Sequence, residues 1–137
     1  LVDITRKNIP RVDMRMAFDT LEYLKKGGRI GPAQAFLGSM LKVNPILTLR
    51  DGEPFPVARE RSRGKAIDYL CNFAMSYSHI EEMAVAHATT PDEAEVLAER
   101  LGSKFPKERI YRSKVGCVVG THVGPRVLAV AVLGDKE

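Results

Sequence analysis

Residues 83–115, MAVAHATTPDEAEVLAERLGSKFPKERIYRSKV, contain the pattern that decides the fold of this chain. The apolar run at its start, residues 83–88, is typical of a buried strand. Thr90-Pro91-Asp92-Glu93 then has the order of a helix start, with threonine at the N-cap, proline at the first helical position and glutamate at the third. A helix ending at Gly102 and a strand over residues 109–115 complete the pattern. Together they predict a βαβ unit, whose two strands run parallel.

Apolar runs on both sides of this unit predict an α/β fold with a mixed sheet. Asp51-Gly52 separates two of these runs and predicts a β-hairpin, because both turn residues tolerate positive φ. Pro54 and Pro56 restrict the second arm of the hairpin to an edge strand. Strands are expected over residues 12–18, 45–50, 53–57, 83–88, 109–115 and 127–133.

Helices are expected before and after the hairpin. Asp19 or Thr20 can cap a short helix over residues 21–26, and Gly27-Gly28 ends it. Pro32 suits the first turn of a second helix that runs to about residue 42. A third helix is expected over residues 64–77, where apolar side chains form one stripe.

Composition limits the class of protein. The 137 residues fit one globular domain, and 45% hydrophobic with 28% charged residues excludes disordered, collagen-like and coiled-coil chains. The net charge of +4 comes from interleaved cations and anions, which argues against a nucleic-acid partner. Two cysteines are too few for a disulfide scaffold, and no apolar run reaches the roughly 20 residues that span a bilayer. Without a signal peptide at the N-terminus, we expect a cytoplasmic protein with reduced thiols.

The segment Gly116–Pro125, GCVVGTHVGP, is the strongest candidate for a binding site. Its glycines and proline predict a tight connection at the end of a strand, where ligands tend to bind in open α/β sheets. His122 can offer a hydrogen bond or positive charge to an anion, and Thr121 adds a hydroxyl. The alternative is a turn whose glycines serve only the backbone, with His122 a surface residue.

Two other basic segments allow both a functional and a purely structural interpretation. In residues 25–31, KKGGRIG, glycines beside Arg29 could bind a carboxylate or phosphate, but a helix cap with a solvated arginine also explains them and is the interpretation that loop chemistry favours. Residues 59–65, RERSRGK, could bind an anion or an acidic partner, or form a solvated helix entrance. His79 and His87 have no partner at metal-ligand spacing, so we expect no metal site.

Several of these motifs together resemble the DegV family. The resemblance begins with residues 19–30, DTLEYLKKGGRI, and continues through Asn44-Pro45-Ile46-Leu47, the Asp51-Gly52 turn and residues 61–66. It ends with residues 120–125, GTHVGP. The motifs stand in the family's order and spacing and cover most of the chain. DegV-family proteins are similar to fatty-acid-binding carriers built of two α/β domains, and the resemblance covers only the second. Residues 1–137 are therefore expected to be a C-terminal domain, with the N-terminal domain outside this chain.

The resemblance implies a carrier rather than an enzyme, with no cofactor and a long-chain fatty acid as ligand. It implies that a separate ATP-dependent fatty-acid kinase phosphorylates the bound acid. His122 matches the family's histidine near the carboxylate, and Thr121 stands beside it. Arg61 matches a family arginine of the kinase encounter. Arg29 matches the Gly-Gly-Arg motif, where it contacts the ligand or has a structural role between the domains. One departure is Arg126, where the family usually has glycine, and this substitution would crowd the site or add a cation to it.

Two other functions stay open. One is an anion-dependent small transferase that uses His122 as acid or base. The other is a regulatory or nucleic-acid-binding module that uses the basic residues 59–65.

Overall fold

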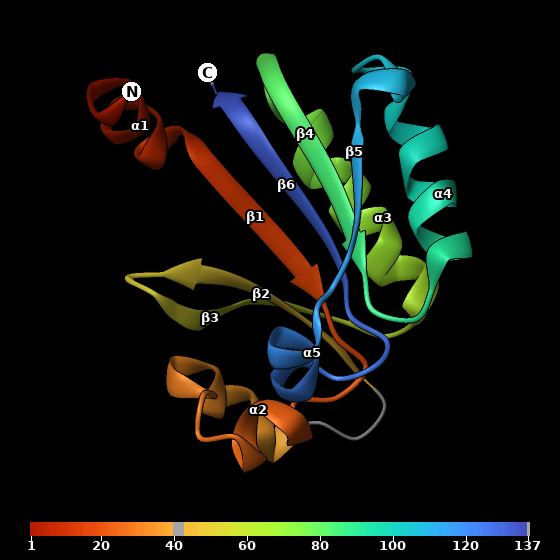
Figure 1. Ribbon diagram of the computed structural model, residues 1–137. Coiled ribbons are helices and arrows are strands. Elements are labelled where there is room, and N and C mark those ends of the chain that lie inside the picture. Colours follow the sequence, from red (N-terminus) through yellow and green to blue (C-terminus); the bar gives the residue numbers. More distant parts are fainter. Residues whose placement is uncertain (40–42, 137) are drawn as a thin grey trace.

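The computed structural model describes residues 1–39 and 43–136 and shows one six-stranded sheet with helices on both of its faces (Figure 1). The strands are β1 (Val12–Ala17), β2 (Asn44–Arg50), β3 (Glu53–Glu60), β4 (His79–His87), β5 (Tyr111–Lys114) and β6 (Leu128–Asp135). The α-helices are α1 (Val2–Asn8), α2 (Glu22–Lys26), α3 (Arg63–Met75), α4 (Pro91–Leu101) and α5 (Cys117–Val123). Short 3-10 helices are η1 (Ile9–Arg11), η2 (Gly31–Ser39) and η3 (Lys107–Arg109).

The strand order is β3-β2-β1-β6-β4-β5, and the sheet is mixed as predicted. β4 and β5 run parallel on either side of α4 in sequence, which confirms the βαβ unit. The other neighbouring strands pair antiparallel. β2 and β3 form the predicted hairpin, with Asp51 at φ 52° and Gly52 at φ 79°, and the proline-containing β3 is an edge strand.

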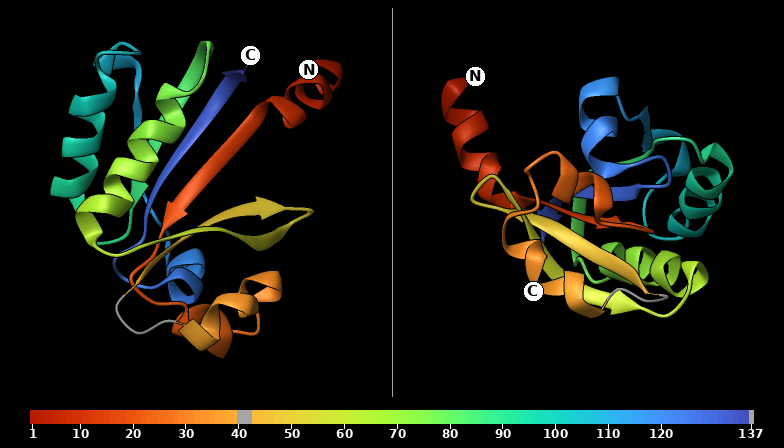
Figure 2. Two further views of the ribbon diagram at one scale, coloured as in Figure 1. Left: turned by 180° about the vertical axis from the view of Figure 1, so that it is seen from behind. Right: turned by 90° about the horizontal axis from the view of Figure 1, so that it is seen from below.

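Helices α3 and α4 cover one face of this sheet (Figure 2). Apolar side chains of both helices pack there against inward residues of β4 and β6, among them Val85 and Val130, which have no exposed surface. This cluster buries the fully enclosed Leu70 of α3 and Leu97 of α4. It is the larger of the two cores and holds the sheet and the two long helices together.

The opposite face carries a second, smaller core at one end. Met16 of β1 lies opposite Leu47 of β2 and Ala129 of β6, and all three belong to this cluster. Side chains of α2, η2 and α5 cover it, including Leu24 and Val123. Figure 1 shows these short helices gathered beyond the C-terminal end of β1, whereas the far end of the same face carries none of them.

Three local predictions need correction. The helix expected from residue 32 is the 3-10 helix η2, and its expected end at residue 42 lies outside the described residues. The connection expected between Gly116 and Pro125 contains a helix, α5. Helix α4 begins at Pro91 as predicted, but the Thr90 side chain makes no capping hydrogen bond, and Glu93 binds Arg63 instead.

Candidate functional site

An apolar cavity of about 590 Å³ lies between the hairpin, helix α5 and the face of the sheet that is opposite α3 and α4, called the open face below. Its wall is mostly apolar, and two basic side chains, His122 and Arg29, belong to it. Three of its apolar residues are also strongly exposed, namely Leu49, Val118 and Val119, so the cavity is open to solvent on that side. The lining residues are Met14, Met16, Phe18, Leu24, Gly28, Arg29, Gly31, Leu49, Gly52, Glu53, Pro54, Val118, Val119, His122 and Val123.

Helix α5 fixes the orientation of His122. Gly116 is its N-cap, and Gly124, at φ 89°, ends it with a backbone conformation that favours glycine. Within the helix, Nδ1 of His122 lies 3.0 Å from the carbonyl oxygen of Val118, one turn earlier. The Thr121 hydroxyl donates in the same way to the Cys117 carbonyl at 2.8 Å. Both side chains are therefore tied to their own helix.

Two glycines let α2 and α5 pack in close contact. A Cβ atom at Gly27 would lie 2.4 Å from Cδ2 of His122 and 2.9 Å from its Nε2, so only glycine leaves room for the ring. A Cβ at Gly124 would lie 2.8 Å from the Tyr23 ring on α2. Figure 1 shows the two helices side by side at one end of the molecule. The glycines expected to shape turns thus also position the imidazole.

Arg29 reaches the same wall from the segment that follows α2. Gly28, at φ 70°, and Gly31, at φ 51°, turn the chain on either side of it. Its Nη1 donates to the Gly27 carbonyl at 3.3 Å, beside the His122 ring. The structure therefore brings together His122 and Arg29, which are separated by more than ninety positions in the sequence.

Thr121 and Arg61 lie elsewhere. Thr121, on the neighbouring position of α5, lines a second groove of about 530 Å³ together with Tyr23 and Cys117. Consecutive helix residues point in different directions, so Thr121 and His122 do not share one cavity. Arg61 is exposed in the short turn before α3 and does not line the cavity of His122.

The basic segment 59–65 is partly engaged in internal contacts. Arg63 makes two hydrogen bonds to Glu93, at 2.9 and 2.8 Å, and one to the Arg126 carbonyl at 2.7 Å. The guanidinium of Arg59 lies 4.9 Å from the Phe36 ring centroid. The hydrogen bonds from Arg63 are the main reason why the pKa of the Glu93 carboxyl is lowered. Arg63 thus joins the start of α3 to the start of α4.

Arg126 neither strains the backbone nor enters the cavity. Among the described residues, Asp51 is the one non-glycine residue with positive φ, so Arg126 does not need the conformational freedom of glycine. Its guanidinium lies 3.9 Å from Glu93 and does not line the cavity. The crowding and the added cation considered from the sequence both fail for this cavity.

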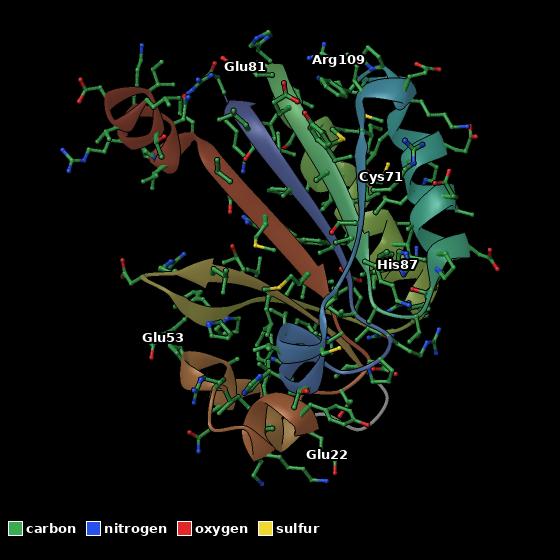
Figure 3. All side chains as sticks on the ribbon, viewed as in Figure 1. Glu22, Glu53, Cys71, Glu81, His87 and Arg109 are labelled. Atoms are coloured by element: carbon green, nitrogen blue, oxygen red, sulfur yellow. The ribbon has the colours of Figure 1, made fainter. Side chains whose placement is uncertain are left out.

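Glu53 was not among the residues singled out from the sequence. It begins β3, lines the cavity and has its side chain 3.5 Å from the Cβ position of Gly31. Figure 3 shows Glu53 on the hairpin side of the molecule, far from Glu81 and Arg109 at the other end of the sheet. The contact between β3 and η2 that places it there is long-range, and the sequence carries no signal for it.

The fold is α/β, and its cavity combines an apolar wall with a histidine and an arginine. A family model described as an uncharacterised protein of the DegV family matches residues 1–135. The chain therefore belongs to the DegV family, and the resemblance seen in its motifs is confirmed.

Relatives and solved structures agree with this assignment. A DegV domain-containing protein of Streptomyces coelicolor is 43% identical over 117 residues, which are 83% of this chain and 42% of that protein. The structure described as fatty acid binding of a DegV family protein from Thermus thermophilus matches at 30% identity with a TM-score of 0.80, over 97% of this chain and 48% of that one. That of DegV, a fatty acid binding protein from Bacillus subtilis, matches at 34% identity with a TM-score of 0.77, over 96% and 48%. The chain thus spans about half the length of these proteins.

The described residues form neither a metal site nor a membrane-spanning helix. They include no group of three or more His, Cys, Asp or Glu side chains arranged to hold a metal ion. In the same residues, no helix combines the length and the apolar character needed to cross a membrane.

Proposed function

We propose that this chain is the C-terminal domain of a fatty-acid carrier, and that His122 and Arg29 bind the acid's carboxylate while the apolar wall binds its chain. The observation that carries the proposal is the cavity of about 590 Å³ in which His122 and Arg29 meet apolar residues of the sheet and of α5. A guanidinium and an imidazole are suited to a carboxylate, and an apolar wall is suited to an alkyl chain.

Family relatives support the choice of ligand. The similar proteins from Thermus thermophilus and Bacillus subtilis are both described as fatty-acid-binding, and both exceed 25% identity. A free amphiphile with one anionic end fits the present cavity, which has few polar groups and many apolar ones.

The solvent-exposed side of the cavity suggests that a second domain covers the bound acid. Val118 and Val119 are 78% and 56% exposed, and an alkyl chain lying against them would face water. Covering that side with a second, N-terminal domain would remove both apolar surfaces from water, at a gain of roughly 25 cal/mol per Å² of apolar surface. We therefore propose that the complete binding site lies between two domains.

We further propose that the carrier does not itself transform the acid but presents it, in the cytoplasm, to an ATP-dependent fatty-acid kinase. Arg61 is exposed at the entrance to α3 and outside the cavity, so it is free to contact a partner while a ligand is bound. Arg61→Glu is then expected to slow phosphorylation of the bound acid by the kinase without changing fatty-acid affinity. Lys104→Glu, on the exposed segment after α4, is the matched charge-reversal control.

Fatty-acid binding is tested with the protein expressed from its full gene. Native mass spectrometry after gentle purification should show a co-purified mass equal to a long-chain fatty acid. An empty protein that also fails to take up added oleate would overturn the proposal. Turnover of an acyl or phosphoryl substrate by the purified protein alone, lost in His122→Ala, would instead indicate the transferase.

A further inference from the structure

The hydrogen bond between His122 and Val118 determines where the imidazole carries its proton. A backbone carbonyl oxygen can only accept, so Nδ1, 3.0 Å away, must be the protonated nitrogen. In the neutral ring, Nε2 then has a lone pair and no hydrogen. The described residues offer Nε2 no hydrogen bond or ion pair. The neutral ring therefore presents an acceptor to any ligand.

An acceptor is the wrong partner for a carboxylate. At neutral pH a fatty acid is ionised, since carboxyl groups have an ordinary pKa near 4. Two groups that only accept repel each other, whereas a proton between them gives a charge-assisted hydrogen bond. Histidine is the side chain that can take up this proton near neutral pH.

We propose, resting on the function proposed above, that the carboxylate binds together with one proton from solvent, held between its oxygen and Nε2 of His122. In this step the proton joins the Nε2 lone pair, giving an imidazolium that donates to the carboxylate. Nδ1 keeps its hydrogen and its bond to the Val118 carbonyl. Gly27 positions the ring, because its missing Cβ leaves the space that the Cδ2–Nε2 edge occupies.

The charges that line the cavity favour protonation of His122 when a carboxylate binds. Arg29 and Glu53 are the charged side chains that line the cavity with His122, and their charges are opposite. Two further titratable residues lie on the helices around the ring. They are Tyr23, on α2 at its contact with α5, and Cys117, the first residue of α5. A carboxylate entering beside Glu53 leaves the cavity with one excess negative charge, which protonation of His122 removes.

Calorimetry with the protein expressed from its full gene tests the proposal. Dodecanoate is titrated at pH 7.5 in buffers of different ionisation enthalpy, and the slope of the observed enthalpy gives the number of protons taken up. We expect a slope close to one for the wild type and near zero for His122→Gln. Affinity should fall by up to tenfold per pH unit above pH 7.5, because one proton accompanies each ligand.

Two controls assign the proton. Dodecanol has the same chain without the carboxylate, so its binding should be independent of pH and also reports whether a variant is folded. Glu53→Gln should keep the slope of the wild type. A slope that survives in His122→Gln but vanishes in Glu53→Gln would assign the proton to Glu53 and overturn the inference.

Nitrogen NMR of ¹⁵N-histidine-labelled protein gives an independent result. The His122 signals, assigned by their loss in His122→Gln, should show a protonated Nδ1 without ligand and two protonated nitrogens with dodecanoate. If dodecanoate binds with zero proton uptake and an unchanged ring, the inference is wrong and the carrier function stands. If neither dodecanoate nor oleate binds, the proposed function fails, and the inference fails with it.

Discussion

The two faces of the sheet are made by alternate residues of the same strands, yet one is closed and the other is open. On the closed face, under α3 and α4, β4 and β6 contribute large side chains: Met83, Val85, Val130 and Val132. On the open face the same strands contribute alanines that lie directly opposite each other in the pairing, Ala84 with Ala131 and Ala86 with Ala129. Neighbouring residues of one strand therefore differ in size and surroundings: the large side chains build the larger core on one face, whereas on the other face Ala129 belongs to the smaller core and Ala86 packs against it.

The largest expected effect tests the closed face. Leu97→Ala removes a side chain with no exposed surface from the core between α4 and the sheet and should cost about 3 kcal/mol of unfolding free energy. Urea denaturation monitored by circular dichroism measures the loss. Met14→Ala, on the half-buried open face, is the control and should cost at most about 1 kcal/mol. Equal losses of unfolding free energy in the two variants would show that both faces contribute equally to stability.

The next effect concerns the ion pair that links the helices of the closed face. Arg63 and Glu93 have side chains that are only 16% and 22% exposed, and Glu93→Gln should cost about 2 kcal/mol, since it leaves a poorly solvated guanidinium without its anion. Because the folded-state pKa of Glu93 is lowered, the pair stabilises the fold above the ordinary carboxyl pKa.

This stabilisation should disappear as the pH falls below about 4.5 and through the lowered pKa. Denaturation of wild type and Glu93→Gln at pH 7 and at pH 3 measures both values. Glu95→Gln is the matched control. Glu95 pairs with Arg112 and is more exposed than Glu93, so its replacement should cost less unfolding free energy. A difference between wild type and Glu93→Gln that is as large at pH 3 as at pH 7 would contradict the role of the charge.

Much of the closed face could be predicted from the sequence, because its signals are local. The strand–helix–strand pattern of residues 83–115, the Asp51-Gly52 turn and the edge position of β3 all follow from residue types at short spacing. The helix α5 could not be predicted in this way. Its three valines and Gly120 have poor helix propensity, and contact with α2 through Gly27 and Gly124 supports it.

The missed helix also explains what was missed at the site. In a tight turn Thr121 and His122 could face one ligand, whereas on α5 they line separate cavities. Arg29 lies beside His122 because Gly27 meets the ring, which is a contact between distant segments. Whether these residues bind a fatty acid stays a prediction, and so does the role of Arg61.

The third effect concerns the position of the His122 ring, which two neighbouring glycines should influence differently. Gly27 has φ −80°, which alanine adopts without backbone strain, so the main effect of Gly27→Ala should be to push the His122 ring from its place. Losing that hydrogen bond to the carboxylate should weaken dodecanoate binding about tenfold. Gly28→Ala is the control: with φ 70° and no atom within 4 Å of its Cβ position, it should cost about 1 kcal/mol of stability and leave the ring in place. Wild-type affinity in Gly27→Ala would show that the ring position is unimportant.

The smallest effect concerns two exposed apolar side chains, one on each side of the sheet. Leu49, on β2, and Val96, on α4, are 49% and 53% exposed, but of the two only Leu49 lines the cavity. Truncating either to alanine should change the unfolding free energy by no more than about 0.5 kcal/mol, since little apolar surface leaves a buried environment. Leu49→Ala should still weaken dodecanoate binding about threefold, because the alkyl chain loses part of the wall that shields it from water, and Val96→Ala should not. Equal affinities for the two variants would place the alkyl chain away from β2, which would leave the open face of the sheet without its proposed part in binding.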